Sequence, residues 1–421
     1  MNIAVIGSGG REHALCWKIA QSPLTKKLYS IPGNGGTNEI AENIDIDLNN
    51  FQKIYTFIKQ NSVNLVIVGP EEPLVNGLVD FLIKKKVNVF GPNKKAAQLE
   101  GSKIFVKNLC KLKKIPTANF KVCYSLKDIK KNIKFFSFPV VVKADGLASG
   151  KGVFICKNYK ILISSAKKIF NGEFKGTKKL VLEEFINGEE LSYFLIVDKY
   201  SFKFFGSAQD HKRAGEKETG PNTGGMGAYS PSLLLNKSLE KKIITKIVTP
   251  TLKYLKEKKI IYRGFLYVGL MIKNNKPYLI EYNVRMGDPE CQVILPLLKS
   301  DLVKTIQCAI KNQLFKTKIV WKKKKSMTIV LCSKGYPGKF KKGIEIQSLE
   351  KIKNIKSTLI FHSGTKFNHG SYYNNGGRVL NIASIGSNFL KIRNKIIDTL
   401  KILNWKNGFY RKDIGWRIFK N

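Results

Sequence analysis

The chain has 421 residues, 43% of them hydrophobic and 11% aromatic, and a formal net charge of +44. This length predicts two to four domains, and the hydrophobic content is that of a globular protein rather than a disordered chain. No apolar run approaches the roughly 20 residues of a membrane-spanning helix, and the N-terminus enters a strand without the basic and apolar regions of a secretory signal. We therefore expect a cytoplasmic protein.

The surplus of positive charge comes from lysine, because only eight of the 74 basic residues are arginine. The lysines are spread along the whole chain. Nucleic-acid-binding proteins concentrate charge on one face and use arginine to contact bases and phosphates. The lysine surplus is therefore better explained by drift of the composition toward AT-rich codons at solvated positions. We expect no specific nucleic-acid partner.

Cysteine and histidine usage points the same way. The cysteines lie far apart without a Cys-x-x-Cys pair, and the four histidines do not join them at ligand spacing. This is typical of reduced thiols in a cytoplasmic protein, and it argues against a zinc site.

The first hundred residues alternate between predicted strands and helices. We expect strands at 2–6, 27–31, 64–68 and 87–90, and helices at 12–21, 51–60 and 78–85. This alternation predicts a parallel sheet with helices on both faces, whose ligands bind at the carboxyl ends of the strands. Small-residue loops follow the first three strands, at 7–13, 32–37 and 69–73.

The loop at 7–13 resembles a dinucleotide-binding fingerprint only in part. The third glycine of the fingerprint is absent, and the second strand ends in Pro-Gly-Asn, where an acidic residue would be needed to bind ribose. Backbone N–H groups at the start of the following helix suit a phosphate monoester instead. A tight turn without a ligand fits this loop about equally well.

An apolar strand at 140–144 carries Lys143 and runs into the glycine-rich loop 145–153. Such loops cover nucleotide phosphates with backbone N–H groups, while a strand lysine reaches a phosphate as a point charge. The alternative is a glycine hairpin without a ligand, which the second lysine, Lys151, makes weaker. The next strand, 180–186, is followed by the turn 187–190, which offers a carboxylate for ribose hydroxyls, although this turn by itself does not indicate a function.

A long polar segment, dense in glycine, covers 210–213 and 220–227. Loops of this length inside compact domains are functional or disordered, and the lack of low-complexity repetition favours function. An amphipathic helix is expected at 239–256, and a hairpin of strands 265–272 and 277–284 turns at Asn274-Asn275. From about Trp321 the pattern predicts an antiparallel β module with a late helix, in which 376–380 and 413–417 are the most distinctive pieces.

The second strand of that hairpin ends in a cluster of polar side chains. Glu281 and Asn283 lie two residues apart, so they share one face of the strand. A carboxylate and an amide oxygen form half of a site for Mg²⁺, which takes its other ligands from phosphates and water. Arg285, two residues after Asn283, is expected to continue this alternation of side chains. Asp288 and Glu290 add two carboxylates nearby. The alternative is an edge strand with solvated charges, which the crowding of these groups disfavours.

Together and in this order, these segments resemble the phosphoribosylamine–glycine ligases, or glycinamide ribonucleotide synthetases, of the ATP-grasp superfamily. The resemblance covers essentially the whole chain and rests on segments 7–13, 69–71, 143–153, 210–213, 220–231, 280–290 and 413–416. Segment 220–231 is specific to this family, whereas the glycine-rich loop and the metal strand occur more widely among ATP-grasp ligases.

The resemblance implies an α/β and α+β multidomain fold. We expect an N-terminal parallel-sheet domain at 1–102, an ATP-grasp domain at 103–320 with a mobile lid at about 117–190, and a small β-rich domain at 321–421. The implied reaction belongs to purine biosynthesis: ATP phosphorylates glycine, and the amine of 5-phosphoribosylamine attacks the glycyl phosphate. One alternative is another ATP-grasp enzyme, either a carboxylate–amine ligase or a carboxylase. The other is a basic nucleic-acid-associated protein that keeps the ligase fold but has lost the activity.

The resemblance also implies the site residues. Arg285 and Asp210 are the expected catalytic residues, and Glu281 and Asn283 are expected to hold Mg²⁺ or Mn²⁺. The residues expected to bind ATP are Lys103, Lys143, Gly150, Lys151, Gly152, Glu183, Phe185 and Glu190. Those expected to bind glycine and 5-phosphoribosylamine are Gly9, Gly10, Gly36, Glu71, Asn222, Thr223, Gly224 and Gly225. The strand at 267–271 offers no carboxylate for a second metal, and we expect a monomer.

Overall fold

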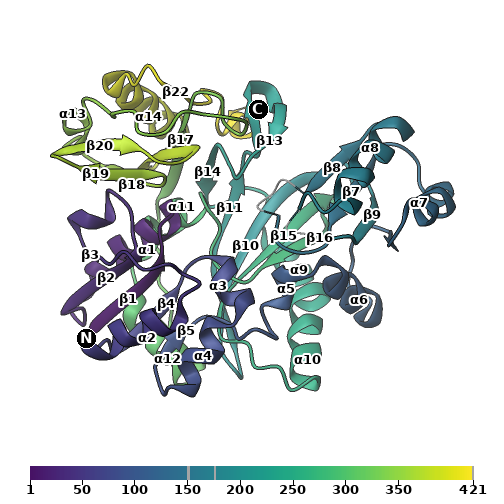
Figure 1. Cartoon of the computed structure of the whole chain (residues 1–421), viewed down its shortest axis with the longest axis horizontal. Helices are drawn as coiled ribbons and strands as arrows, with labels where there is room; N and C mark the ends of the chain where they lie inside the picture. The colour runs from purple at the N-terminus through teal and green to yellow at the C-terminus, as the bar shows by residue number, and fades with distance from the viewer. Residues whose placement is uncertain (149–151, 175–176, 420–421) are drawn as a thin grey trace.

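The computed structural model describes residues 1–148, 152–174 and 177–419, which are built around sheets of five, four and nine strands (Figure 1). The N-terminal sheet has the order β3-β2-β1-β4-β5, and all its pairings are parallel. Its strands are β1 (Asn2–Gly7), β2 (Lys27–Pro32), β3 (Glu42–Asn43), β4 (Leu65–Val68) and β5 (Val89–Phe90). The expected parallel sheet is confirmed, with one short strand, β3, that the pattern missed.

The N-terminal sheet is buried on both faces because successive side chains of β1 point in opposite directions. Ala4 and Ile6 join one hydrophobic cluster, and Ile3 and Val5 join another that includes residues of the central region. The helices that accompany the sheet are α1 (Gly10–Ala20), α2 (Phe51–Gln60), α3 (Glu71–Asn76) and α4 (Leu78–Lys84). The carboxyl ends of β1, β2 and β4 therefore meet at one edge.

A small antiparallel sheet of order β6-β9-β7-β8 stands apart with its own core, at the right of Figure 1. Its strands are β6 (Phe120–Cys123), β7 (Val140–Ala144), β8 (Val153–Cys156) and β9 (Leu180–Glu184). Helices α7 (Leu126–Asn132) and α8 (Tyr159–Phe170) accompany it, and α6 (Lys103–Lys113) follows the short helix α5 (Gln98–Gly101) on the way to this sheet. This region lies within the span expected for an ATP lid.

The nine-stranded sheet runs through both the central and the C-terminal regions, in the order β16-β15-β10-β11-β14-β17-β21-β18, with β22 paired to β17. Its central strands are β10 (Glu189–Val197), β11 (Phe202–Asp210), β14 (Gly227–Ser230), β15 (Gly264–Lys273) and β16 (Lys276–Asn283). Its C-terminal strands are β17 (Lys325–Ser333), β18 (Thr358–His362), β21 (Arg378–Gly386) and β22 (Gly408–Phe409). The β14–β17 pairing joins the two regions into one continuous sheet.

Two smaller hairpins extend from the sheet: β12 (Arg213–Gly215) with β13 (Thr219–Asn222), and β19 (Thr365–Asn368) with β20 (Ser371–Asn374). The predicted hairpin of β15 and β16 is confirmed. It turns at Asn274 and Asn275, which both have positive φ. Asparagine tolerates this conformation, which two-residue hairpin turns require.

The amphipathic helix expected at 239–256 is divided into α9 (Lys237–Ile243), a π-helical turn (Ile244–Val248) and α10 (Thr249–Glu257). Pro250 lacks the N–H that a regular helix would use at this point, which explains the wider turn before it. The remaining long helices are α12 (Leu302–Ile310) and α14 (Phe389–Leu403), and the short helix α11 (Cys291–Ile294) follows the end of β16. No helix among the described residues is long and apolar enough to cross a membrane.

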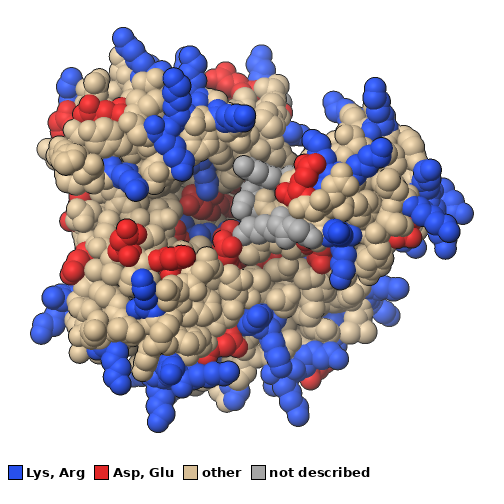
Figure 2. Space-filling view, viewed as in Figure 1, with Lys and Arg blue, Asp and Glu red and all other residues tan. Residues whose placement is uncertain are grey.

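Lysine and arginine side chains project all around the outer surface, whereas several acidic side chains lie in the hollow at the centre of the same face (Figure 2). The basic groups on this face do not gather into one stripe. On this face the distribution matches the even spread of lysine along the sequence.

Candidate active site

The end of β16 presents its polar side chains on one face. Tyr282 and Val284 are buried in the core, whereas Glu281, Asn283 and Arg285 are half-buried. Because side chains alternate along a strand, the carboxylate and the amide lie on the same side, and Arg285 follows in the bend after β16, where its charge acts on Glu281. This strand end is the centre of the candidate site.

Cations from separate elements surround the Glu281 carboxylate. Burial alone would raise the pKa of Glu281, but Lys212, Lys143 and Lys103 outweigh burial and lower that pKa. No described side chain forms an ion pair or a hydrogen bond with Glu281. The carboxylate is therefore ionised at neutral pH, and its oxygens remain able to bind a cation.

Two of these lysines are fixed by neighbouring groups. The Nζ of Lys103, at the start of α6, donates to the carbonyl of Gly146 at 2.9 Å. The Nζ of Lys143, on β7, lies 3.0 Å from Oε2 of Glu183 on β9 and 3.3 Å from the carbonyl oxygen of Ile280 on β16. These contacts bring the small sheet, helix α6 and the end of β16 to one place.

Other residues expected to bind ATP lie around the same point. Lys212 Nζ is 2.7 Å from Oε2 of Glu190, and although burial opposes its charge, Glu190 raises the pKa of Lys212 well above its usual range. Phe185 is 38% exposed just beyond the end of β9, and Gly152 is buried at the start of β8. Gly150 and Lys151 lie outside the described residues.

Arg285 is held between two carboxylates. Its Nε lies 3.2 Å from Oε2 of Glu71, and its Nη2 lies 2.7 Å from Oε1 of Glu100. Burial opposes the charge of Arg285, but Glu100 and Glu71 outweigh burial and raise its pKa. Although burial also opposes the charge of Glu71, Arg285 and Arg11 lower its pKa to about 2. The other oxygen of Glu100 accepts from the N–H of Val284 at 2.8 Å.

The burial of Glu100 predicts a pH-dependent stability. Burial raises the pKa of Glu100 to about 7, despite the nearby charge of Arg285. A carboxyl group whose pKa is raised on folding stabilises the protein fully below its unfolded pKa, near 4.5, and this stabilisation is lost as pH rises toward 7. We expect the free energy of unfolding, relative to that of a Glu100→Gln variant, to fall by up to about 3 kcal/mol across this window. Urea unfolding of both proteins at pH 5 and pH 7.5 measures the difference, and parallel pH profiles would contradict the prediction.

The loop before α1 does not offer free backbone donors at two of its positions. The N–H of Gly9 donates to Oε2 of Glu12 at 2.7 Å, and the N–H of Arg11 donates to Oδ2 of Asp288 at 3.3 Å. A phosphate at these donors would meet two carboxylates. The structure therefore disfavours a phosphate held by this helix N-terminus alone.

Gly10 and Gly36, two glycines expected to bind the ribosylamine, lie where neighbouring residues pack too closely to leave room for a side chain. A side chain at Gly10 would lie 2.5 Å from the Nε2 of Gln292 on α11. A side chain at Gly36 would lie 2.4 Å from the His13 ring and 2.5 Å from the His362 ring of β18. Both glycines therefore allow the N-terminal region to approach neighbouring elements.

A cavity of about 720 Å³ lies between the N-terminal loops and the C-terminal region. Its basic lining residues are Lys366 and Arg378, and its acidic ones are Asp45 and Asp288. It is also lined by Ser8, Gly9, Pro32, Gly33, Asn34, Gly35, Asn38, Asn43, Tyr336, Ser363, Gly364, Thr365, Phe367, Asn375 and Gly377. The polar lining suits a hydroxyl-rich anionic molecule.

Arg378 connects this cavity to the glycine-rich loop 222–225. Its Nη1 donates to the carbonyl oxygens of Gly224, at 2.7 Å, and Asp288, at 2.6 Å. The N–H of Gly224 donates to the hydroxyl of Tyr336 at 3.0 Å. The hydroxyl of Thr223 accepts from the N–H of Gly225 at 3.0 Å, and this fixes the loop internally.

Asp210 ends β11 directly beneath this loop. A side chain at Gly225 would lie 2.8 Å from Oδ1 of Asp210, so glycine permits the close approach. Burial and the charge of Glu290 raise the pKa of Asp210 well above its usual range, and burial also raises the pKa of Glu290. Ser192 Oγ donates to Oε1 of Glu290 at 3.0 Å. The two carboxyl groups therefore retain a proton to higher pH than isolated ones do.

Three family models match consecutive parts of the chain. All describe phosphoribosylglycinamide synthetase: its N domain matches residues 1–100, its ATP-grasp (A) domain residues 101–291, and its C domain residues 326–417. The curated phosphoribosylamine–glycine ligase of Brucella melitensis is 43% identical over 418 residues, which cover 99% of this chain and 98% of that protein. The chain belongs to the phosphoribosylglycinamide synthetase family.

Solved structures agree with this family and with the wider fold. The crystal structure of phosphoribosylamine–glycine ligase from Thermotoga maritima is 33% identical, with a TM-score of 0.86 covering 98% of this chain and 100% of that one. The biotin carboxylase domain of 2-oxoglutarate carboxylase from Hydrogenobacter thermophilus, solved with MgADP, has a TM-score of 0.73 but 17% identity over 95% of this chain and 89% of that one. The latter likeness concerns the fold alone. The resemblance to phosphoribosylglycinamide synthetases drawn from the sequence is confirmed.

Several residues of this family member's site escaped sequence reasoning. Lys107 is buried on α6, where its Nζ lies 3.3 Å from Oε1 of Glu183 and donates to Thr117 Oγ1 at 2.7 Å. Its position four residues after Lys103, on the same helical face, was the available signal. Glu100 and Arg378 carried no local signal, because their partners are distant in the sequence.

The residues present fit a magnesium ion. Glu281 and Asn283 offer two oxygen ligands on one face, and the described residues contain no cluster of three His, Cys, Asp or Glu that would form a complete protein cage. Mg²⁺ suits such an open set, because it keeps water and substrate phosphates among its ligands. The nearby lysines would hold those phosphates.

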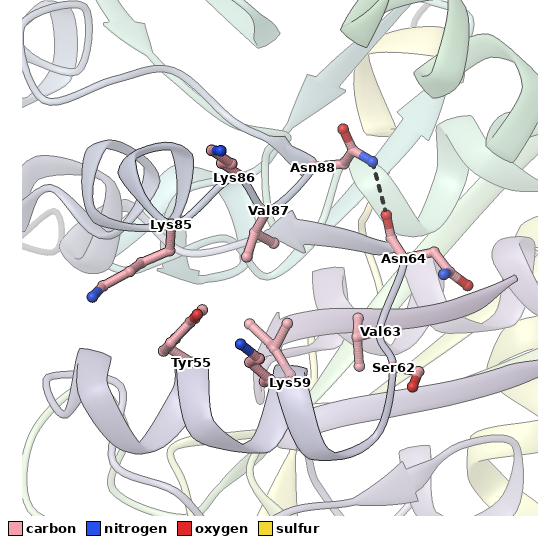
Figure 3. A pocket seen from close by; sticks show the side chains of 10 residues that line it. Tyr55, Lys59, Ser62, Val63, Asn64, Lys85, Lys86, Val87 and Asn88 are labelled. Atoms are coloured by element: carbon pink, nitrogen blue, oxygen red, sulfur yellow. Dashed lines mark hydrogen bonds between the residues drawn. The ribbon is translucent and has the colours of Figure 1, made fainter.

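A second hollow, of about 370 Å³, lies on the N-terminal region between α2 and the turn before β5 (Figure 3). Lys59, Lys85 and Lys86 at its edge are exposed, and Asn88 donates to the carbonyl of Asn64 at 3.3 Å. It lies at the amino ends of β4 and β5, opposite the loops that carry the site. Exposed lysines at this end of a parallel sheet do not form a convergent binding site.

Proposed function

We propose that this protein joins glycine to 5-phosphoribosylamine at the expense of ATP, through a glycyl phosphate, and releases glycinamide ribonucleotide, ADP and phosphate. One observation carries the proposal: in a chain of this family, the Nζ of Lys143 contacts the carbonyl of Ile280 beside Glu281, and the charges of Lys143, Lys103 and Lys212, from separate parts of the chain, act on that carboxylate. Phosphoryl transfer needs positioning and neutralisation of oxygen charge rather than a protein nucleophile. The site offers both.

We propose that ATP lies between the small sheet and the end of β16. Lys103 and Lys143 would hold phosphate oxygens, Glu190 the ribose, and the backbone around Phe185 the adenine. Glu281 and Asn283 would hold Mg²⁺, which would neutralise charge on the ATP phosphates. Mn²⁺ offers similar chemistry with the same oxygen ligands.

We propose that Arg285 stabilises the charge that builds on the transferring phosphoryl group. Its guanidinium follows the end of β16 closely enough for its charge to act on Glu281, and Glu71 and Glu100 fix its plane. A donor fixed before the reaction stabilises the transition state without reorganising. Glu71 would then act by holding Arg285 as well as by facing the ribosylamine.

We propose that 5-phosphoribosylamine occupies the cavity between the N-terminal loops and the C-terminal region. Lys366 and Arg378 would bind its phosphate, and the asparagine-rich lining its hydroxyls. Its amine must reach the acyl phosphate as a neutral nucleophile, with Asp210 and the loop at 222–225 on the glycine side. The retained proton of the Asp210 and Glu290 pair leaves this pair able to bind an ammonium or to exchange a proton.

Replacing Arg378 with methionine is expected to raise the KM for 5-phosphoribosylamine by about 10- to 100-fold, because charge-assisted hydrogen bonds worth roughly 1.5–3 kcal/mol are lost. The KM for ATP should stay within about twofold of the wild-type value. Steady-state kinetics with each substrate varied in turn measures the KM for 5-phosphoribosylamine and the KM for ATP separately. Arg393→Met, in helix α14, is the matched control, and an unchanged ribosylamine KM in Arg378→Met would remove Arg378 from the phosphate site.

A substrate-omission assay tests the function itself. Pure protein is incubated with ATP, Mg²⁺, glycine and freshly made 5-phosphoribosylamine, and ADP release is followed while each component is left out. We expect ADP release only when glycine and the ribosylamine are both present. ADP release that ignores glycine but requires bicarbonate would instead favour an ATP-grasp carboxylase.

We also propose domain boundaries at about residues 102 and 320, and a cytoplasmic monomer. The proposal is supported by the family models for the N and C domains, which match residues 1–100 and 326–417. The continuous β14–β17 pairing implies that the second and third domains unfold together. Light scattering coupled to gel filtration measures the oligomeric state, and a mass near 47.5 kDa is expected.

A further inference from the structure

Residues 411–417, here called the C-terminal segment, are distant in the sequence from the candidate site but contact the hairpin β12–β13. This hairpin links Asp210 and His211 at one end to the glycine-rich loop 222–225 at the other. The contacts fall into two groups, one at the tip of the hairpin and one at its base.

At the tip, Arg411 is 1% exposed and all its nitrogens are used. Its Nε lies 2.8 Å from Oδ1 of Asp413, its Nη1 donates to the carbonyl of Arg213 at 2.9 Å, and its Nη2 lies 3.0 Å from Oε1 of Glu218. Two carboxylates therefore balance one buried guanidinium. The contacts tie the segment to strand β12 and to the turn of the hairpin.

The turn of the hairpin is held as well. The N–H of Lys217 donates to Oδ2 of Asp413 at 2.8 Å, and Nε1 of Trp416 donates to Oε1 of Glu218 at 3.2 Å. Lys217 and Glu218 both have positive φ, a conformation that costs free energy for residues other than glycine. The surrounding contacts are what keep this turn in place.

At the base, the segment reaches the catalytic side through His211. The N–H of Gly415 donates to Nε2 of His211 at 3.1 Å, so Nδ1 carries the proton that is shared with the carbonyl of Gly227, 3.3 Å away. His211 is fully buried, and burial lowers its pKa to about 3, so the ring is neutral. The backbone N–H of His211 donates to Oδ1 of Asp210 at 2.7 Å.

Gly415 is the residue that makes this contact possible. Its φ of +79° favours glycine, and a side chain there would lie 2.6 Å from the terminal methyl of Met327. A larger residue would move the N–H away from His211. The family-typical piece Asp413-Ile414-Gly415-Trp416 thus has a local physical reason for its glycine.

We propose that the C-terminal segment is a positioning element of the active site: it fixes His211 and the β12–β13 hairpin, and so sets where Asp210 and the loop 222–225 meet the substrates. It touches no substrate itself. The inference rests on the proposed function, because it assumes that Asp210 and this loop serve glycine and the ribosylamine.

Gly415→Ala is the first test, measured by kinetics with each substrate varied. We expect kcat for glycine-dependent ADP release to fall by about 10- to 100-fold, because small misplacements of reacting groups have effects of this size. The KM for ATP should stay within about twofold of wild type. Trp416→Phe, which keeps an aromatic side chain but is smaller and lacks the indole N–H that donates to Glu218, should lower kcat by about 2- to 10-fold. Trypsin should cut the folded variants faster after the exposed Lys217.

Leu400→Ala is the matched control, since it weakens the C-terminal core at α14 without contacting the hairpin. It should lower Tm but leave kcat and each KM unchanged. If the segment were purely structural, Gly415→Ala and Trp416→Phe would also lower Tm and leave kcat and each KM unchanged. That result would overturn the proposal. If Gly415→Ala does not fold, Trp416→Phe decides. A wild-type enzyme without glycine dependence would refute the proposed function, whereas an active wild type with unaffected variants refutes only the positioning role.

Discussion

Replacing Glu281 with glutamine is expected to abolish turnover, with kcat at least about 1,000-fold lower, while the fold stays intact. The amide keeps the shape of the side chain but removes the charge that faces the metal and the surrounding lysines. Metal-based stabilisation of transferring phosphates is worth several kcal/mol, and each 1.36 kcal/mol corresponds to a factor of ten in rate. No ion pair of a described residue is broken by the change, so the far-ultraviolet circular dichroism spectrum should match that of the wild type.

The control is Glu257→Gln, the same chemical change at an exposed position on α10, where the carboxylate pairs with Lys113. This variant should retain wild-type kcat. The dependence of rate on Mg²⁺ concentration adds a second measure, because Glu281→Gln should need far more metal for any residual activity. Normal turnover in Glu281→Gln would show that the metal strand is wrongly assigned.

The parts of the fold that sequence predicted are those governed by local patterns. The parallel N-terminal sheet followed from alternating apolar runs, and the β15–β16 hairpin from two strands joined by Asn274 and Asn275, which tolerate positive φ. No local pattern predicts strand β14 (Gly227–Ser230), whose first residue ends the glycine-dense segment 220–227. It is a strand because β11 and β17 pair with it on either side.

The parts of the site that sequence could not supply depend on contacts between distant segments. Arg285 lies 185 positions from Glu100, and Arg378 lies 90 positions from Asp288, so no spacing reveals either pair. In the loop at 7–13 a distant contact removes a feature that the local pattern predicts. Its pattern offered free N–H groups, but Asp288, 277 positions away, accepts one of them. Family resemblance supplied site residues, and the structure supplied the groups that hold them.

Removing Arg285 is expected to lower kcat by about 100- to 1,000-fold, as the loss of one preorganised donor costs roughly 2–4 kcal/mol of transition-state stabilisation. Arg285→Met should also destabilise the fold, because Glu71 and Glu100 lose their shared partner. Breaking a fully buried ion pair typically costs about 3–5 kcal/mol, and these half-buried pairs should cost less. Since burial raises the pKa of Glu100 to about 7, this carboxyl can take up a proton and relieve part of that cost.

A double variant separates the two effects. Arg285→Met combined with Glu100→Gln leaves one fewer buried charge, so its free energy of unfolding should recover relative to Arg285→Met alone, while kcat stays low. Glu100→Gln by itself, with Arg285 still paired to Glu71, should lose less activity than either variant that lacks the guanidinium. Urea unfolding and single-turnover ADP formation are measured for the wild type, the two single variants and the double variant. Together these four proteins form a double-mutant cycle. If kcat recovered together with stability in the double variant, Arg285 would serve to hold the strand end against Glu71 and Glu100 rather than to act on the transferring phosphoryl group.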